Sequence, residues 1–259
     1  MFMHVADLVE RLDSQFPFAS AAQWDVVGLQ IGWPDAELDR VGVCHEVTDA
    51  VVDGCIQQTI TTLVSYHPLL FSPTTELVSG PTPAGRALRL ARHGISLVVV
   101  HTAYDTATPG TGDALLQTLG LGSGATRRWA VEDGDDECAP GRLVELATPM
   151  TGADLASLVA ARLDTSVRST GGDDTVSTIA VLPGSGGSHA MEAATIADAF
   201  ITGDVSHHTA AAAKARGLVI IDAGHTATER PGIAALYASV SEEVDEAIHL
   251  SDDPTPWEA

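Results

Sequence analysis

Four short segments of this chain carry side chains that can bind a divalent metal ion, and each follows an apolar run. They are YHP at 66–68, HTAYD at 101–105, GDVSHH at 203–208 and GHTATE at 224–229. The runs before them are rich in β-branched residues and are typical of buried strands. Residues just beyond the carboxyl ends of parallel strands meet at one edge of an α/β sheet, where such folds bind ligands. Imidazole and carboxylate groups at such an edge predict a zinc, manganese or iron site.

The first two segments offer His67 and Asp105 as ligands. Pro68 favours an extended conformation at His67, which places that histidine at the end of a strand. Asp105 shares a loop with His101, and a carboxylate can bridge two ions, so Asp105 is the preferred ligand and His101 an orienting group beside it. A lone histidine at a strand end is more often structural, and the prediction for His67 therefore depends on its partners.

The last segment offers His225 and Glu229. Gly224 permits a tight turn before His225, and the two side chains are four residues apart. Imidazole and carboxylate can therefore reach one ion if a helix starts near Thr226. The alternative is that Thr226 caps the helix and Glu229 is solvated.

Apolar periodicity and turn residues predict strands alternating with helices along the chain. We predict helices near 5–12, 49–56, 86–93, 113–119, 153–163, 209–216 and 233–240, and strands near 41–43, 62–64, 95–100, 143–147, 175–182, 199–202 and 218–222. Asp49 is expected to cap the second helix. The Gly-, Asp- and Glu-rich segment 122–141 is expected to be a boundary or insertion loop, and the tail after His249 is expected to be irregular. The alternation indicates an α/β fold in two units.

Two further features are expected to be structural. The turn PGSGGS at 183–188 could bind a phosphate through backbone amides, but it lacks the Gly-Lys-Ser/Thr of a P-loop, so plain turn geometry is favoured. His45 follows Cys44 in an expected strand, and we interpret it as a core or edge histidine.

The composition is that of a globular protein of one large or two small domains, with 259 residues of which 45% are hydrophobic. No apolar stretch approaches the ~20 residues of a membrane span. The start, MFMHV, lacks the features of a signal peptide, which predicts a cytoplasmic protein. Cys44, Cys55 and Cys138 are too few and scattered for a disulfide framework or a zinc knuckle, and we expect buried thiols.

The charge is strongly negative. Asp and Glu total 35 against 13 Lys and Arg, for a net charge of −22, and Lys214 is the single lysine. This charge would repel nucleic acids and anionic membranes, so neither is an expected partner. Dispersed carboxylates with almost no lysine resemble salt-in halophilic proteins, in which molar salt screens the repulsion. The alternative is an ordinary acidic bacterial protein from a GC-rich genome.

Five motifs of the chain resemble the signature blocks of one known family, in that family's order. They are WDVVGLQ at 24–30, YHPLLF at 66–71, HTAYD at 101–105, TGDVSHH at 202–208 and GHTATE at 224–229. The chain thereby resembles the short form of the Nif-three-like family, a dinuclear metal-centre hexameric family whose members are often named GTP cyclohydrolase I type 2 homologues. The resemblance implies two α/β domains, residues 1–124 plus 225–259 and residues 125–224, with a metal site in the cleft between them. It also implies a homohexameric ring, a trimer of dimers.

The resemblance also places the family's metal ligands. They fall on Tyr66, His67, Asp105, His225 and Glu229. Tyr66 departs from the pattern, because the family has a second histidine there, and a phenol with a pKa of ~10 is a weak ligand. The implied cofactor is therefore zinc, manganese or iron, with one or two ions per chain. His101, His207 and His208 are the spare imidazoles that could compensate.

Three classes of function follow. The first is a metal-dependent hydrolase of the GTP cyclohydrolase or phosphoesterase type, acting on a nucleotide or phosphoester through metal-activated water. Its general acid or base would be Asp25, His101 or His208. The second is a non-catalytic metal-binding or metal-trafficking oligomer. The third is a ring-shaped interaction scaffold in which the metal is structural.

Overall fold

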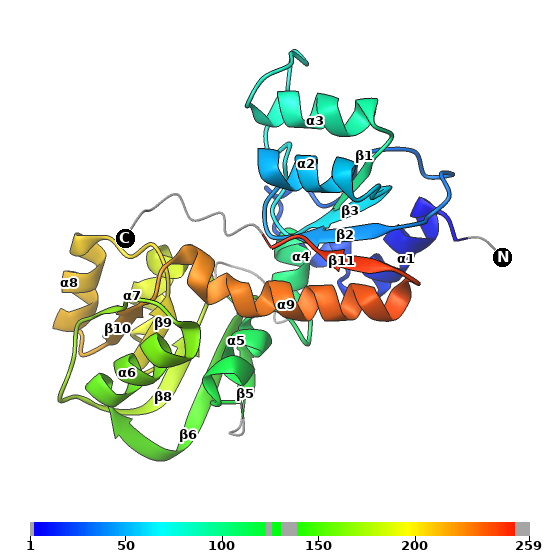
Figure 1. Cartoon of the computed structure of the whole chain (residues 1–259). Coiled ribbons are helices and arrows are strands. Elements are labelled where there is room, and N and C mark those ends of the chain that lie inside the picture. Colours follow the sequence, from blue (N-terminus) through cyan, green and yellow to red (C-terminus); the bar gives the residue numbers. More distant parts are fainter. Residues whose placement is uncertain (1–2, 123–125, 131–138, 252–259) are drawn as a thin grey trace. The chain divides into compact units, whose positions relative to one another are not determined.

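The computed structural model describes residues 3–122, 126–130 and 139–251 (Figure 1). The chain divides into two compact units: unit 1 is Met1–Ala107 with Ile233–Ala259, and unit 2 is Thr108–Gly232. In the described residues these units contain two sheets and nine α-helices, which confirms an α/β fold with a discontinuous first domain. Within the described part, no helix has the length and apolar character needed to cross a membrane.

Unit 1 is built on a five-stranded sheet in the order β1-β4-β3-β2-β11. These strands are β1 (Gly28–Ile31), β4 (Ser96–Val99), β3 (Thr62–Ser65), β2 (Val41–Cys44) and β11 (Ala247–His249). β11, β2, β3 and β4 are parallel, and β1 is an antiparallel edge strand. The helices of this unit are α1 (Val5–Gln15), α2 (Asp49–Gln57), α3 (Pro83–Arg92), α4 (His101–Thr106) and the later part of α9 (His225–Glu243), with the short 3-10 helix η1 (Phe18–Ser20).

Both faces of this sheet are buried, as expected of parallel strands. Successive strand residues point to opposite faces, so Leu63 and Val64 enter two different cores. Leu63 packs with α2 and α3, whereas Val64 packs with α1 and the end of α9. Figure 1 shows these helix pairs on opposite sides of the sheet. Covered faces leave the strand ends as the place where polar side chains can gather.

Unit 2 is built on a six-stranded sheet in the order β5-β6-β8-β9-β10-β7. Its strands are β5 (Thr126–Trp129), β6 (Gly141–Thr151), β8 (Thr175–Val181), β9 (Ala199–Thr202), β10 (Val219–Asp222) and β7 (Arg168–Ser169). Its helices are α5 (Thr111–Leu119), α6 (Gly152–Leu163), α7 (Ala190–Ala193), α8 (His207–Ala215) and the start of α9, with the 3-10 helix η2 (Gly186–His189). α5 and α6 pack on one core, and α7 and α8 pack on the other. The central strands β8, β9 and β10 are parallel.

Several local predictions differ from the structure. The cap of α2 is Thr48, whose side chain accepts a hydrogen bond from the backbone of Val51, and Asp49 is the first helical residue. Part of segment 122–141 is the strand β5, because it pairs with β6, while 123–125 and the acidic stretch 131–138 lie outside the described residues. The expected irregular tail likewise lies outside them from residue 252 onward.

The unit boundaries also differ from the boundaries expected from the sequence, which were 124/125 and 224/225. The structure divides the chain after Ala107 and after Gly232. Leu115, Leu116 and Leu119 of α5 are buried in a core of unit 2, which assigns that helix to the second unit. The other boundary falls inside α9, which starts at His225 and contains Pro231, a residue that local propensity disfavours in a helix interior.

Candidate metal centre

Three parallel strands of unit 1 each end on a segment that carries a histidine. His45 follows β2, Tyr66 and His67 follow β3, and His101 follows β4. The backbone pairing continues beyond the strands, with His67 N donating to His45 O at 2.9 Å and His101 N donating to Tyr66 O at 3.0 Å. The strand ends therefore bring these side chains to one edge of the sheet, as predicted for the segments at 66–68 and 101–105. The segments at 203–208 and 224–229 follow strands of the other sheet, in unit 2, so the four segments do not share one sheet edge.

His45 and His67 form a close imidazole pair within unit 1. Their ring centroids lie 4.8 Å apart with an interplanar angle of 26°, and His45 is buried. The sequence interpretation of His45 as a core or edge histidine overlooked that it follows β2 as His67 follows β3. That shared position was the signal that could have found it. Among the described residues, His45 is also one of those that could hold a metal ion.

Tyr66 is buried and is bonded to one of the predicted ligands. Its hydroxyl donates a hydrogen bond to Asp105 Oδ1 at 2.8 Å. A neutral phenol that donates its proton in this way holds the carboxylate in place. The contact thus gives Tyr66 a supporting role beside Asp105.

Asp25 and His101 form a second bonded pair in unit 1. Asp25 Oδ1 lies 2.8 Å from His101 Nδ1, and its other oxygen accepts hydrogen bonds from the backbone and the hydroxyl of Thr102. Burial alone would raise the pKa of Asp25, but the hydrogen bond and charge of His101 and the bonds from Thr102 outweigh it, and the pKa lies below its ordinary value. When His101 is neutral, the Asp25 carboxylate favours the tautomer in which Nδ1 carries the proton and Nε2 is the acceptor.

Unit 2 has a comparable edge at the ends of β8, β9 and β10. Gly184, Asp204 and His225 follow these three parallel strands. His225 Nδ1 lies 2.8 Å from Asp204 Oδ2, and its Nε2 lies 3.2 Å from Glu229 Oε2. The bond to Glu229, which outweighs partial burial, raises the pKa of His225 to about 9. The helix needed to bring His225 and Glu229 together does start here, at His225.

Glu229 is only 3% exposed, which is unusual for a carboxylate. Gly184 lies directly against it: a methyl group at Gly184 would overlap Glu229 Oε1. Gly184 also has a φ of +72°, which an L side chain rarely adopts. The glycine-rich turn at 183–188 is therefore shaped around the Glu229 carboxylate, which gives a specific reason for the plain turn geometry that the sequence favoured.

The remaining predicted histidines have a different setting. His207 and His208 are exposed at the start of α8, and their rings contact each other at a centroid distance of 5.4 Å. Within unit 2 they are not members of the bonded chain that joins Asp204, His225 and Glu229. The structure therefore adds no contact that supports His208 as a catalytic group.

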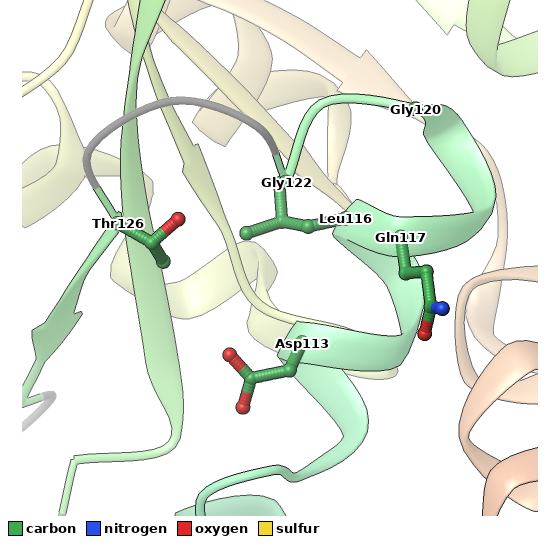
Figure 2. Close-up of a pocket in the computed structure, with 6 residues that line it drawn as sticks. All are labelled: Asp113, Leu116, Gln117, Gly120, Gly122 and Thr126. Atoms are coloured by element: carbon green, nitrogen blue, oxygen red, sulfur yellow. The ribbon is translucent and has the colours of Figure 1, made fainter.

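Unit 2 also has a surface pocket that holds none of the predicted site residues (Figure 2). It is lined by Asp113, Leu116, Gln117, Gly120, Gly122 and Thr126. Asp113, the charged residue among the described lining residues, accepts hydrogen bonds from the buried guanidinium of Arg142 at 2.8 and 3.0 Å. We interpret Asp113 as the partner of this buried cation.

The donor groups fit a borderline divalent metal. Among the described residues, His45, His67 and Glu229 form a group that could hold a metal ion, with one ligand atom from each. Nitrogen and oxygen donors of this kind suit zinc, manganese and iron. The glycine cradle around Glu229 is the structural observation that supports a dedicated ligand position.

By fold and donor set, this is a two-unit α/β protein with a candidate metal centre. The chain belongs to the Duf34/NIF3 (NGG1p interacting factor 3) family, whose sequence model matches residues 3–256. This finding confirms the resemblance inferred from the five motifs.

Individual relatives agree with this assignment. The chain is 35% identical to a Streptomyces coelicolor protein named GTP cyclohydrolase 1 type 2 homolog, over 98% of this chain and 94% of that protein. A Nostoc protein of the same name is 34% identical over 88% of each chain. The structure of a Staphylococcus aureus hypothetical protein matches all of both chains with a TM-score of 0.88 and 26% identity. Reduced HcgD from Methanocaldococcus jannaschii matches 97% of this chain and 99% of its own with a TM-score of 0.82 and 25% identity.

Proposed function

We propose that this protein is a metal-dependent hydrolase that acts on a nucleotide or phosphoester. In this proposal one divalent ion is held by His45 and His67 of unit 1 and by Glu229 of unit 2, each of which offers one ligand atom. The observation that carries the proposal is the stacked pair of His45 and His67 at the ends of two neighbouring parallel strands. His45 supplies the imidazole that position 66 lacks. Asp105 and His225 remain as donors for a second ion, which is held less tightly because Tyr66 is a poor ligand.

Such an ion would lower the pKa of a coordinated water toward ~7, which makes hydroxide available as a nucleophile at neutral pH. His101 is the proposed general base, because Asp25 fixes the proton on Nδ1 and leaves Nε2 to accept one. Asp25 acts through His101, and Tyr66 acts through Asp105 by holding its carboxylate. The names of the relatives support a nucleotide substrate, since they are called GTP cyclohydrolase 1 type 2 homologs.

Elemental analysis combined with a turnover assay tests this function. The purified protein should carry at least one zinc, manganese or iron ion per chain, and His67→Ala and His45→Ala should each lower that content strongly. His208→Ala is the matched control, because this histidine is exposed and should leave the content unchanged. Metal-loaded protein should hydrolyse GTP or a phosphoester, and His101→Gln should slow that reaction while retaining metal. Retained metal without turnover would point instead to the non-catalytic metal-binding class.

A further inference from the structure

Two large aromatic side chains stand exposed beside His101. Trp24 is 55% exposed and Phe71 is 50% exposed, and their ring centroids are 5.9 Å apart. The Trp24 ring also lies 6.0 Å from the ring of His101, and His101 lies 5.3 Å from His67. The exposed pair, which we call the aromatic platform, is thus continuous with the candidate site of unit 1.

Buried contacts fix the backbone under Trp24. Its neighbour Asp25 has a fully buried side chain that is bonded to His101 and Thr102. The amide of Ala22 donates to the Thr102 hydroxyl at 3.0 Å, and the amide of Asp25 donates to Ala22 O at 2.9 Å. The turn that presents Trp24 is therefore tied at several points to the segment that presents His101.

The residue before Phe71 is fixed as well. Leu70 N donates to Gln30 Oε1 at 3.0 Å, and Gln30 Nε2 donates back to Leu70 O at 3.4 Å. Gln30 belongs to β1, so this amide pairing ties the loop that carries Phe71 to the edge of the sheet. These contacts explain parts of two family motifs that contain no proposed metal ligand, WDVVGLQ at 24–30 and the LLF that ends YHPLLF.

The ring angles suit a ligand that stacks. Phe71 is tilted by 59° and His101 by 70° relative to the Trp24 ring. Neither neighbour therefore covers the indole face to face. A flat heteroaromatic ring can stack on such a platform, and base–aromatic stacking is favourable for any nucleobase.

We propose that Trp24 and Phe71 bind the planar base of a nucleoside-type ligand and hold it beside His101. This inference rests on the proposed hydrolase function and narrows its substrate from a nucleotide or phosphoester to a nucleotide. Aromatic rings offer nothing to a bare phosphoester, and the net charge of −22 disfavours a small anion without such an anchor. A second copy of the chain is the competing occupant of these rings.

Equilibrium binding to the full-length, metal-loaded protein tests the platform. The probes are guanosine, which has a base and no charge, and ribose 5-phosphate, which has a phosphate and no base. Guanosine should bind with measurable affinity by calorimetry, and ribose 5-phosphate should bind at least about 10-fold more weakly, since it has no base to stack on the rings. Trp24→Leu should weaken guanosine binding about 10-fold, and Trp24→Phe should weaken it less. Trp33→Leu is the matched control, because Trp33 is exposed to a similar degree, 49%, and should leave binding unchanged.

Several outcomes would overturn the platform. They are no guanosine binding up to its solubility limit, equal binding of ribose 5-phosphate, or an unchanged affinity in both Trp24→Leu and Phe71→Leu. Loss of the oligomer in Trp24→Leu by sedimentation velocity, with no guanosine binding by the natural protein, would assign the rings to a contact between copies. Guanosine binding that depends on Trp24, without any turnover, would exclude the hydrolase function but support base binding by the aromatic platform. Turnover that is unchanged in Trp24→Leu would support the hydrolase function and exclude a role for the aromatic platform in it.

Discussion

The hydroxyl of Tyr66 donates a hydrogen bond to Asp105 Oδ1 at 2.8 Å. Tyr66 occupies a position where the family has a histidine ligand, and here its side chain holds the Asp105 carboxylate in place. Replacing it tests this role. Tyr66→His should raise metal content toward two ions per chain, because a neutral imidazole binds a borderline metal far better than a protonated phenol. Tyr66→Phe is the control: it removes the donor without adding a ligand and should not raise metal content. Two fully occupied ions in the natural protein, measured by elemental analysis, would contradict this account.

Glu229 should be the carboxylate on which metal binding depends most. Glu229→Gln keeps the shape of the side chain but removes its charge. Mutation of a residue that only orients a metal ligand lowers metal affinity about 10- to 100-fold, and Glu229→Gln should lower it by more than that. Competition with a chelator measures the affinity, and Glu145→Gln, an exposed glutamate of the same unit, serves as the control. An unchanged affinity in Glu229→Gln would remove this residue from the site.

The metal-free protein should show a histidine with a strongly raised pKa. His225 has a pKa of about 9 in the folded chain against 6.5 for an ordinary histidine. Because the folded value is the higher one, the stabilisation from this group is complete below pH 6.5 and is lost as the pH rises through about 9. A two-dimensional NMR titration should assign this value to His225, and Glu229→Gln should lower it. Titration of His225 near pH 6.5 in the stripped protein would show that the bond to Glu229 is not formed.

Gly184 should be intolerant of a side chain. Gly184→Ala places a methyl group against Glu229 Oε1 at a φ of +72° and should cost about 1–3 kcal/mol of stability, with a loss of metal affinity. Gly172→Ala is the matched control in the same unit, because nothing lies within 4 Å of a methyl group there. Chemical denaturation measures both. Equal stabilities of the two variants would contradict the cradle around Glu229.

The family resemblance and the net charge of −22 together predict a hexameric ring that requires salt. At 1 M salt the Debye length falls to ~3 Å, so repulsion between carboxylates is screened. Light scattering across a potassium chloride series should show the ring at molar salt and dissociation or unfolding in dilute buffer. A monomer at every salt concentration would exclude the hexamer, and full stability in dilute buffer would exclude a halophilic protein.

Much of the fold follows from local patterns. The apolar, β-branched runs before His67, His101 and His225 are the strands β3, β4 and β10, as predicted. The continuity of α9 did not follow, because periodicity predicted a helix only at 233–240 and a start near Thr226 was one of two alternatives, whereas a single helix begins at His225 and runs through Pro231. Hydrophobic periodicity predicts the strands and helices that bury apolar residues well. It says little about where a helix begins when its first residues are polar and lie at the edge of a sheet.

Candidate metal donors could be selected from the sequence by residue type, but their contacts could not. His67, Asp105, His225 and Glu229 could be selected because each lies in a motif with a second polar residue. His45 has no such motif, and its importance depends on the register of β2 beside β3, a long-range pairing. The burial of Glu229 and the bond from Tyr66 to Asp105 likewise depend on residues distant in the sequence.

The most direct test of the proposed centre is an anomalous-scattering map of crystals of the metal-loaded protein, recorded at the absorption edges of zinc, manganese and iron. We predict a peak within bonding distance of His45, His67 and Glu229, about 2.0–2.2 Å from their nitrogen and oxygen atoms. A map with no peak at these residues, or a peak that excludes His45 and is ligated by Tyr66, would contradict the account.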